Sequence, residues 1–377
     1  MTTAATLAFS IPDSSRFGLR VFRGTLPVVD ARVLFRELVD NAVDLAIVRT
    51  AAGQGAPLAQ LGRYGLHPLH ADTLVYYEVA LDRHEPKPLR NGDLDFSEAG
   101  AGDGDALQAL VAGTFADYTS HYHANPILDR DAILAGYAEW AAGYLGGGGD
   151  RRTWVARRDG EVVAFACCGF DEAAGVCEGV LYGVRPDQSG GGLYGDLIRY
   201  TQARFRELGN TRMKVSTQVW TLAVQKVWSR EGFSLVQAFD TWHVNALLSA
   251  GEPAIEETVV FTSEQVRQFA SATGDTNSVH LDDDAARAAG FESRISHGML
   301  AGSELSRIFG TQAPGFGTLF LRSELAFLAP VYPDREHVLR VRFPGSASLR
   351  GHALAVATLH DGSGRLCLLA YNDLLKR

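Results

Sequence analysis

The spacing of apolar residues predicts short strands and amphipathic helices through the first two thirds of the chain. Residues 43–50 (VDLAIVRT) and 73–81 (TLVYYEVAL) are short, β-branched and aromatic, as strands usually are. Residues 30–42 have apolar positions at helical spacing, with Asp30 as a suitable N-cap. The same criteria predict further strands at 153–158, 161–170, 176–184 and 212–219 and further helices at 104–118, 130–145 and 221–233. This alternation indicates an α/β unit.

The last third of the chain has helices first and strands after. Helices are predicted at 263–274, 283–289 and 296–310, and strands at 317–330, 336–345, 352–362 and 365–375. In the third of these strands Leu354, Val356 and Thr358 alternate with other residues, which is expected where one face of a sheet is buried. A few helices against one antiparallel sheet form an α+β layer architecture.

Two polar stretches interrupt the pattern and suggest domain boundaries. Residues 89–106 (LRNGDLDFSEAGAGDGDA) are rich in Gly and Asp, and residues 247–258 (LLSAGEPAIEET) carry Gly, Pro and acids. They divide the chain into an N-terminal α/β segment (1–92), a middle domain (93–249) and a C-terminal domain (255–377).

Composition restricts the classes of partner. The 377 residues are 46% apolar and 21% charged, with a net charge of −9 and no basic block. A nucleic-acid surface and an anionic membrane surface both need clustered Lys and Arg, so neither partner is expected. The chain has no apolar run near the ~20 residues that span a bilayer, and its start lacks the pattern of a signal peptide. We therefore expect a cytoplasmic protein.

The four cysteines give no sign of a metal site. Cys167, Cys168, Cys177 and Cys367 form no C-x-x-C pair, and no His or Cys stands near them at ligand spacing. Small buried side chains in a reducing compartment are the simpler interpretation. No bound metal is predicted.

Three consecutive glycines, Gly190 to Gly192, stand between a predicted strand and an amphipathic helix in "VRPDQSGGGLYGDL". Backbone N–H groups at such a turn, together with the helix N-terminus, can bind a pyrophosphate. Glycine suits the position because a Cβ would block close approach. By itself the loop is equally compatible with a flexible connection.

The order of elements around this loop resembles the acetyl-CoA-binding core of the GNAT acyltransferases. The resemblance rests on the strand ending in "VRP", the glycines, the helix, "TQV" on a strand and then "REGF". It implies a GNAT fold with a splayed strand that holds the pantetheine arm of a coenzyme A thioester. The implied cofactor-binding residues are Leu181, Tyr182, Gly183 and Val184 for the pantetheine arm, and Gly190, Gly191, Gly192, Leu193, Tyr194 and Gly195 for the pyrophosphate.

The resemblance extends to one branch of that family. "FADYTSHYHANPILD", "VSTQVWTLAVQKVWSREGF" and "DTWHV" are similar to dTDP-fucosamine N-acetyltransferases and related enzymes, and the first segment looks like their N-terminal part. This implies a dTDP-linked amino sugar as acceptor, with His121 and His123 in the wall of its pocket. One position departs from the family: Trp228 stands where a tyrosine often protonates the leaving thiolate. Tyr194 is a possible replacement.

An Asp–His pair marks the C-terminal third. In "GDTNSVH" the residues Gly274, Asp275 and Asn277 favour a tight turn that can direct Asp275 and His280 to one point. With the following "RISHGML" and "GTQAPGFGTLFLRSELAFLAPV", this stretch resembles the MaoC-like (R)-specific enoyl-CoA hydratases. The resemblance implies a hotdog fold, a curved antiparallel sheet around a central helix.

Hydration of an α,β-unsaturated thioester needs a water activated at C3 and a proton delivered to C2. Asp275 and His280 are the implied acid–base pair. The backbone N–H of Gly298 is the implied donor to the enolate oxygen, helped by the helix dipole. Ser306 is expected to orient the pair or the thioester.

Together these resemblances predict an α/β GNAT fold, preceded by a GNAT-like α/β segment and followed by an α+β hotdog fold. The predicted function is bifunctional: hydration of a short trans-2-enoyl-CoA such as crotonyl-CoA, and N-acylation of the dTDP-amino sugar with the (R)-3-hydroxyacyl product. The donor could also be an acyl-carrier protein, and a homodimer through the hotdog domain is expected. The alternatives are a hydratase with a scaffolding GNAT domain, a simple amino-sugar N-acetyltransferase, and a non-catalytic acyl-CoA sensor.

Overall fold

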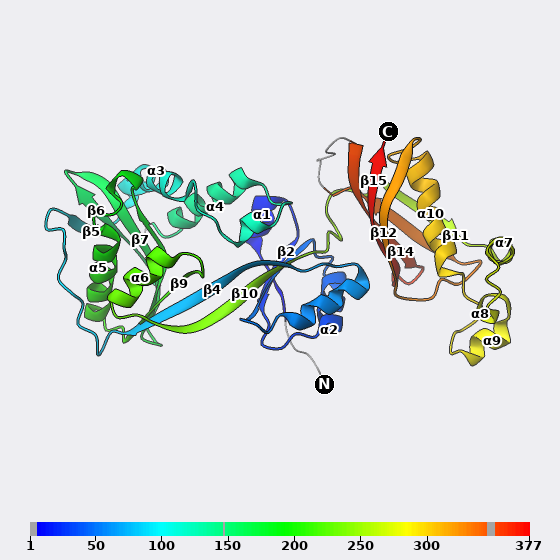
Figure 1. Ribbon diagram of the computed structural model, residues 1–377, viewed down its shortest axis with the longest axis horizontal. Coiled ribbons are helices and arrows are strands. Elements are labelled where there is room, and N and C mark those ends of the chain that lie inside the picture. Colours follow the sequence, from blue (N-terminus) through cyan, green and yellow to red (C-terminus); the bar gives the residue numbers. More distant parts are fainter. Residues whose placement is uncertain (1–5, 146–147, 345–350) are drawn as a thin grey trace.

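The computed structural model describes residues 6–145, 148–344 and 351–377. These residues form a ten-stranded sheet followed by a separate five-stranded sheet (Figure 1). No helix among them has the length and apolar content needed to cross a membrane.

The elements of the larger sheet come from the first 245 residues. Its strands are β1 (Ala8–Phe9), β2 (Val21–Thr25), β3 (Leu45–Ala51), β4 (Leu69–Ala80), β5 (Asp95–Glu98), β6 (Arg151–Arg158), β7 (Glu161–Asp171), β8 (Val176–Val184), β9 (Arg212–Gln218) and β10 (Ser234–Asn245). The helices of this part are α1 (Ile11–Phe17), α2 (Ala31–Asp40), η1 (Ala56–Tyr64), η2 (Ala101–Asp103), α3 (Gly104–Phe115), η3 (His121–Ala124), α4 (Arg130–Ala142), η4 (Pro186–Gln188), α5 (Leu193–Glu207) and α6 (Leu222–Arg230). Asp30 caps α2 as predicted, accepting hydrogen bonds from the amides of Arg32 and Val33.

The N-terminal segment and the middle domain share this one sheet. The strand order is β1-β2-β3-β10-β4-β9-β8-β7-β6-β5, so β4 of the first segment lies between β9 and β10 of the second. β4 pairs with β10 from Leu69 to Glu78 and with β9 from Leu74 to Ala80. The boundary proposed near residue 92 therefore falls within a continuous sheet, in the loop between β4 and β5.

Strand β10 is what joins the two segments, and it is absent from the sequence-based prediction. Its exposed apolar residues Leu235 and Val236 and its polar residues Asp240, Thr241 and His243 give it no clear alternation. Its position between β3 and β4 depends on contacts with residues 156 to 200 positions earlier. Such long-range pairing leaves no local signal in the sequence.

The second sheet wraps around one long helix, as the hotdog resemblance predicts. Its strands follow the order β11 (Ile255–Val260), β13 (Glu336–Arg342), β14 (His352–Asp361), β15 (Leu366–Lys376) and β12 (Thr318–Phe327). Its helices are α7 (Ser263–Thr273), α8 (Ser278–Leu281), α9 (Asp283–Ala288) and α10 (Gly298–Thr311). Leu305, Ile308 and Phe309 of α10 are buried against β13, β14 and β15.

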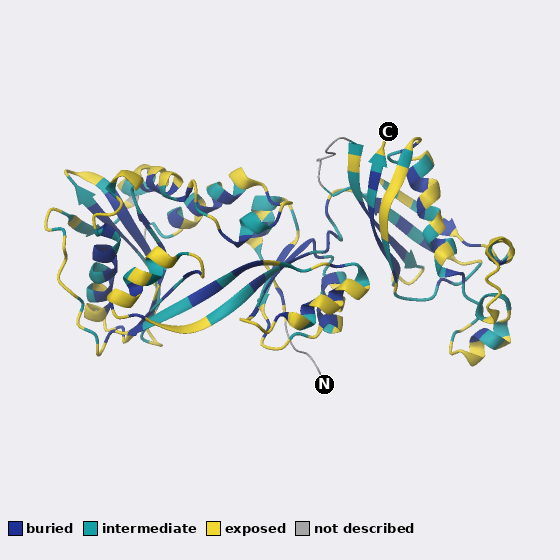
Figure 2. Cartoon of the chain, in the orientation of Figure 1, coloured by how far each residue is buried: buried dark blue, intermediate teal, exposed yellow. Residues whose placement is uncertain are grey.

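The opposite face of this sheet packs on the N-terminal part of the chain. Val356, Leu369 and Tyr371 belong to the same buried cluster as α2 and η1. The Tyr371 hydroxyl donates a hydrogen bond of 2.7 Å to the carbonyl of Ala246, and His67 bonds to Glu324 at 2.7 Å. Figure 2 shows buried ribbon on β14 and β15, largely exposed ribbon on α7, and mixed intermediate and exposed ribbon on α8 and α9, which extend away from the sheet.

Candidate functional site

The parallel strands β8 and β9 separate along their length. They pair from Val176 and Arg212 as far as Gly179 and Val215, but both strands continue beyond that point. Leu181 to Val184 then pair only with β7 on the other side. The backbone groups of this segment that face β9 are consequently available to an extended ligand, as the pantetheine arm of coenzyme A would require.

Gly183 shows why small residues occur in this segment. A Cβ at Gly183 would lie 2.2 Å from a ring carbon of Phe165, so no other residue fits without movement. The neighbouring Tyr182 donates a hydrogen bond of 2.9 Å to Thr201 on α5, and burial raises its pKa. The residues predicted to bind pantetheine thus have a fixed backbone where β8 separates from β9.

The predicted phosphate loop joins this strand to the start of α5. Gly190 and Gly192 have φ values of +86° and +90°, which favour glycine. Gly192 is the N-cap of α5 and offers no side chain to bond the amides of the first turn. Leu193, Tyr194 and Gly195 are the first three residues of the helix, so their N–H groups are the ones that an α-helix leaves without internal partners. This is the arrangement that binds phosphate at a helix N-terminus.

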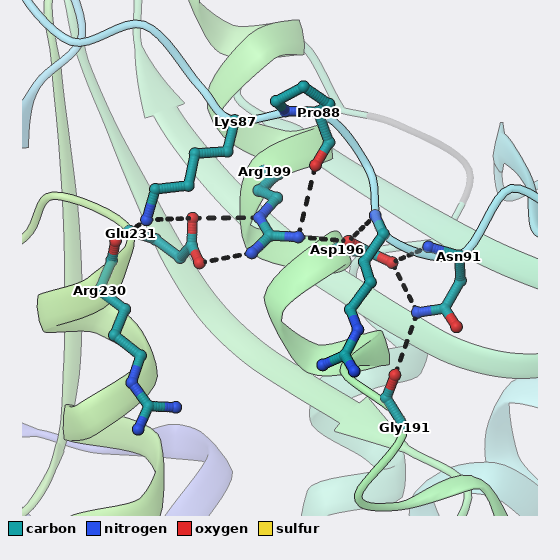
Figure 3. Close-up of polar contacts among 9 residues, drawn as sticks. Lys87, Pro88, Asn91, Gly191, Asp196, Arg199, Arg230 and Glu231 are labelled. Atoms are coloured by element: carbon teal, nitrogen blue, oxygen red, sulfur yellow. Dashed lines mark hydrogen bonds and ion pairs between the residues drawn. The ribbon is translucent and has the colours of Figure 1, made fainter.

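A segment from the β4–β5 loop lies beside this glycine loop (Figure 3). The buried carboxylate of Asp196, on α5, accepts hydrogen bonds from the backbone amides of Arg90 and Asn91 at 2.8 and 2.9 Å. The Asn91 side chain bonds both Asp196, at 2.8 Å, and the Gly191 carbonyl, at 3.2 Å. Residues 90–91 are therefore held against the start of the helix.

This attachment brings a cation to the glycine loop. A Cβ at Gly192 would lie 3.2 Å from Cδ and 3.5 Å from a guanidinium nitrogen of Arg90. The Arg90 side chain is exposed, and no ion pair within the described ranges involves it. Arg90 thus puts a positive charge beside the glycine loop from a different part of the chain.

Ion pairs to Glu231, the residue that follows α6, also hold the β4–β5 loop near α5. Arg199 forms two hydrogen bonds with the Glu231 carboxylate, at 3.1 and 2.7 Å, and one with Asp196 at 2.9 Å. Lys87 approaches Glu231 at 3.6 Å (Figure 3). These bonds lower the pKa of the Glu231 carboxyl despite its burial and keep the residues 87–91 over the first half of the helix.

Trp228 and Tyr194 are in direct contact. The Trp228 indole donates a hydrogen bond of 3.1 Å to the Tyr194 hydroxyl oxygen, and burial raises the pKa of Tyr194. The phenol is therefore protonated at neutral pH, and its hydroxyl hydrogen does not point toward Trp228. Trp228 cannot supply a proton but it orients a side chain that can.

His121 and His123 bond to protein groups. His121 is buried, and its Nδ1 lies 2.9 Å from Nε2 of His243 on β10. His123 Nδ1 accepts a hydrogen bond of 3.1 Å from the Ser120 amide. Burial lowers the pKa of His121 well below its usual value and that of His243 to about 4, so both rings are neutral at pH 7. The contact between His121 and His243 joins the α3–α4 connection to β10. A role of His121 and His123 toward an acceptor sugar is a proposal.

In the hotdog domain the chain brings Asp275, His280 and His297 together. Their ligand-type atoms all lie within 4.8 Å of one another, and the ring centroids of His280 and His297 lie 3.9 Å apart with the rings tilted by 33°. The Asp275 side chain is about half exposed, at 51%, whereas that of His297 is 2% exposed. A carboxylate that water can reach thus lies beside two imidazoles.

Hydrogen bonds to backbone carbonyls assign the tautomer of each ring. His280 Nδ1 lies 2.9 Å from the carbonyl of Ile295, and His297 Nε2 lies 3.0 Å from that of Asp275. A carbonyl oxygen only accepts, so each of these nitrogens carries the hydrogen. In the neutral rings, His280 Nε2 and His297 Nδ1 keep their lone pairs. His280 Nε2 is therefore the ring nitrogen that can accept a proton.

Gly298 and Ser306 lie at different distances from this group. Gly298 follows His297 directly and opens α10, and a Cβ there would lie 2.9 Å from the ring of Phe327. Ser306 is eight residues further along the helix, about 12 Å at 1.5 Å per residue, and is exposed. Within one chain Gly298 is thus beside the pair and Ser306 is apart from it.

Several residues at these sites are missing from the sequence-based prediction. His297 was visible in "SHGML", inside the helix predicted at 296–310, and it is the N-cap of the observed helix α10. Asp196 was visible as an acid near a helix N-terminus next to the glycines. For Arg90 and Asn91 the sequence carries no signal, because their place beside Gly191 follows from the path of the loop.

Two family models match the chain. The acetyltransferase (GNAT) family matches residues 115–233, and the MaoC like domain matches residues 248–361. A mitochondrial 3-hydroxyacyl-(acyl-carrier-protein) dehydratase of Arabidopsis thaliana is 37% identical over 101 residues, 27% of this chain and 59% of that protein. An (R)-specific enoyl-CoA hydratase of Aeromonas caviae is 40% identical over 76 residues, 20% of this chain and 57% of that protein. The chain thus spans little more than half the length of these curated relatives.

Among solved structures, a GCN5-related N-acetyltransferase from Sphaerobacter thermophilus is similar with a TM-score of 0.41 and 14% identity, over 59% of this chain and 72% of that one. The two family matches and the two sheets described above indicate the same pair of domains. Residues 115–233 form a GNAT acetyltransferase domain and residues 248–361 a MaoC-like hotdog domain, and both indicate an enzyme.

Proposed function

We propose that the protein hydrates a short trans-2-enoyl-CoA, such as crotonyl-CoA, and transfers the resulting (R)-3-hydroxyacyl group to the amine of a dTDP-linked amino sugar. The observation that carries the hydratase half is the fixed tautomer of His280 beside Asp275. The transferase half is supported by the splayed strands and by the glycine loop with Arg90 beside it.

In the hydratase step a water molecule between Asp275 and His280 attacks C3 of the enoyl group. His280 Nε2 is positioned to take the proton of that water, because its Nδ1–H is engaged with Ile295. C2 then gains a proton from the pair, and the Gly298 amide at the start of α10 stabilises the enolate oxygen between the two events. Ser306 is proposed to contact the thioester chain further along the helix.

In the transfer step coenzyme A lies along Leu181 to Val184 with its pyrophosphate on the loop at Gly190 to Gly195. The amine attacks the thioester carbonyl, and the departing thiolate takes up a proton. Tyr194 is the proposed donor, because its oxygen accepts from Trp228 and its hydrogen is free to point toward the sulfur.

The hotdog domain is also proposed to form the contact of a homodimer. Strand β12 is an edge strand of the described five-stranded sheet, and its residues Leu319, Phe320 and Leu321 are between 41 and 51% exposed. A long apolar edge strand of this kind tends to pair with another strand. Sedimentation velocity should give the mass of two chains, and a monomer at micromolar concentration would contradict this.

The decisive experiment for the whole proposal is the mass of the sugar product. Wild-type protein supplied with crotonyl-CoA and dTDP-fucosamine should form the 3-hydroxybutanamido sugar. A pocket built to bond a hydroxyl discriminates strongly against an analogue without one, so acetyl-CoA and crotonyl-CoA should be poorer donors. Acetyl transfer as the most efficient reaction would favour a simple amino-sugar N-acetyltransferase, and hydration without any transfer would favour a scaffolding role for the GNAT domain.

A further inference from the structure

One face of the ten-stranded sheet carries a row of polar side chains from three neighbouring strands. Arg49 on β3 pairs directly with Thr241 on β10, and Thr241 pairs directly with Asp72 on β4. Directly paired residues point to the same side of a sheet. This is the side of Ile47, whose buried cluster includes residues of α3 and α4.

Asp72 is unlike the other buried carboxylates of the chain. It is 1% exposed, and within the part of the chain that the structure describes neither of its oxygens has a hydrogen-bond partner. Asp13, Asp44 and Asp196 are equally buried, but each accepts three or more hydrogen bonds. A buried carboxylate without partners destabilises a fold by several kcal/mol, so its presence indicates a role other than stability.

The surroundings of Asp72 lead toward the splay between β8 and β9. Leu74, on the same face of β4, pairs with Gln218, which ends β9. The Gln218 amide oxygen accepts a hydrogen bond from the Tyr118 hydroxyl, which comes from the connection between α3 and α4. Tyr76, two residues further, bonds Arg49 at 3.3 Å and is only half-buried. The face thus runs from the buried Asp72 to the partly exposed Tyr76.

We propose that Asp72 is the group that binds the ammonium of the acyl acceptor and removes its proton. The inference rests on the proposed transferase function and adds the acceptor side of that site. An ammonium offers three donors to a carboxylate that has none, and its positive charge compensates a buried negative one. Because Asp72 lies outside the matched GNAT segment, this assignment comes from the fold and from no motif.

The reaction balances with Asp72 in this role. The ammonium gives one proton to Asp72, and the neutral nitrogen attacks the thioester carbonyl, forming the C–N bond. Expulsion of coenzyme A breaks the C–S bond, and the second proton leaves the nitrogen as the thiolate gains one. Asp72 then releases its proton to solvent, so the products are the amide, the free thiol and one proton.

Other titratable groups also face Asp72. Burial raises the pKa of the Asp72 carboxyl, whereas the nearby polar groups of Thr241, Arg49, Gln218 and His70 act in the opposite direction and favour its ionised form. Tyr76, Tyr118 and Tyr137 lie near enough to be affected by its charge, and burial keeps all three phenols protonated at neutral pH. Asp72 is therefore the carboxyl on this face of the sheet that can exchange a proton with the substrate amine.

The test compares wild-type protein with Asp72→Asn over pH 6.5 to 9.5, using acyl-CoA and dTDP-fucosamine. At pH 6.5 the variant should lose about 10²-fold in kcat/KM, within the range of a general acid–base group. At pH 9.5 much of the amine is already neutral, so the loss should shrink to within about 10-fold of wild type. The variant should unfold at no lower temperature, since it removes a buried charge.

Asp240→Asn is the matched control. Asp240 lies one residue from Thr241 but accepts from the Gly53 amide and from Thr73, at 2.8 and 2.7 Å. It should lose stability and keep the wild-type pH profile of transfer. An Asp72→Asn protein with a wild-type rate at pH 6.5, or with a loss that does not change with pH, would overturn the assignment. If wild-type protein itself transfers nothing to the amine, the proposed function fails, and this inference fails with it.

Discussion

The two candidate sites differ in how far apart their residues lie in the sequence. The hydratase group comes from residues 275–298, a short stretch that includes the helices α8 and α9 and the first residue of α10. The transferase site combines Asp72, Arg90 and Asn91 with residues 181–196, Gln218 and Trp228. The first can be recognised as a motif, whereas the second exists only after β4 and β10 have joined two segments into one sheet.

This difference has a functional consequence. A site contained in one short stretch can be lost or gained with that stretch, and its neighbours need little adjustment. A site built from distant segments depends on the packing of the whole sheet, so variants far from the chemistry should affect it. Independent loss of the two activities is therefore the first property to examine.

The largest effect is expected for Asp275→Asn. An amide cannot exchange a proton with the attacking water, so the hydration rate should fall by about 10²–10⁴-fold. Loss of the conjugated thioester absorbance measures the rate. Transfer from a supplied (R)-3-hydroxybutyryl-CoA should be unchanged, and Asp361→Asn, at the β14–β15 turn, should hydrate at the wild-type rate. Equal damage to both activities would show that the sites are not independent.

Gly191→Glu should produce the opposite loss. A carboxylate on the glycine loop would repel the pyrophosphate, and a like-charge contact costs several kcal/mol, roughly 10²-fold or more in affinity. Isothermal titration with coenzyme A measures this, and hydration of crotonyl-CoA should persist. Gly113→Glu, on an exposed position of α3 with open space around it, is the control for added charge. Retained coenzyme A affinity in Gly191→Glu would remove the loop from the site.

The contact between His121 in the α3–α4 connection and His243 on β10 should make the stability of the fold depend on pH. His121 and His243 have folded-state pKa values below their usual value of about 6.5, with that of His243 about 4. Below pH 6.5 the unfolded chain binds protons that the folded chain does not, so the free energy of unfolding should fall by about 1.4 kcal/mol per pH unit for each ring. Above pH 7 these rings should have no effect.

Urea denaturation at pH 7, 6 and 5 measures this dependence. His243→Gln should unfold more easily at pH 7 but with a weaker dependence on pH, because one of the two rings no longer titrates. His352→Gln, on an exposed position of β14, should keep the wild-type dependence. If the free energy of unfolding depended on pH equally in wild type and in His243→Gln, the neutral His121–His243 pair would be contradicted.

The smallest effect is expected for Arg90→Gln. An exposed guanidinium beside a phosphate contributes up to about 1 kcal/mol, so coenzyme A affinity should fall about 5-fold, and less so at high salt. Arg83→Gln, in the same loop and at an 86% exposed side chain, should bind coenzyme A normally. If both variants behave alike, Arg90 has no part in the site and the transferase is less dispersed than we propose.

The sequence predicted most helices and strands because their apolar periodicity is local. The strand at 176–184, the glycine loop and the helix after it match the described elements, whereas the turn predicted to carry Asp275 and His280 holds Asp275 and is followed by the short helix α8, on which His280 lies. Strand β10 was missed because its partners are remote and its alternation is weak. His297 was missed because its approach to Asp275 depends on how α10 docks, although it stands next to Gly298.

The sequence by itself determined the order of the two enzyme-like domains and the residue types of the hydratase pair, since neighbouring residues meet within one turn of chain. Only the tertiary structure decided which side chains complete each site. The tautomer of His280 depends on the carbonyl of Ile295, fifteen residues away. The isolation of Asp72 depends on β3, β10 and the α3–α4 connection closing around it. Such contacts join segments that are far apart in the sequence, and no local pattern in either segment shows that they will meet. They become visible only in the assembled sheet.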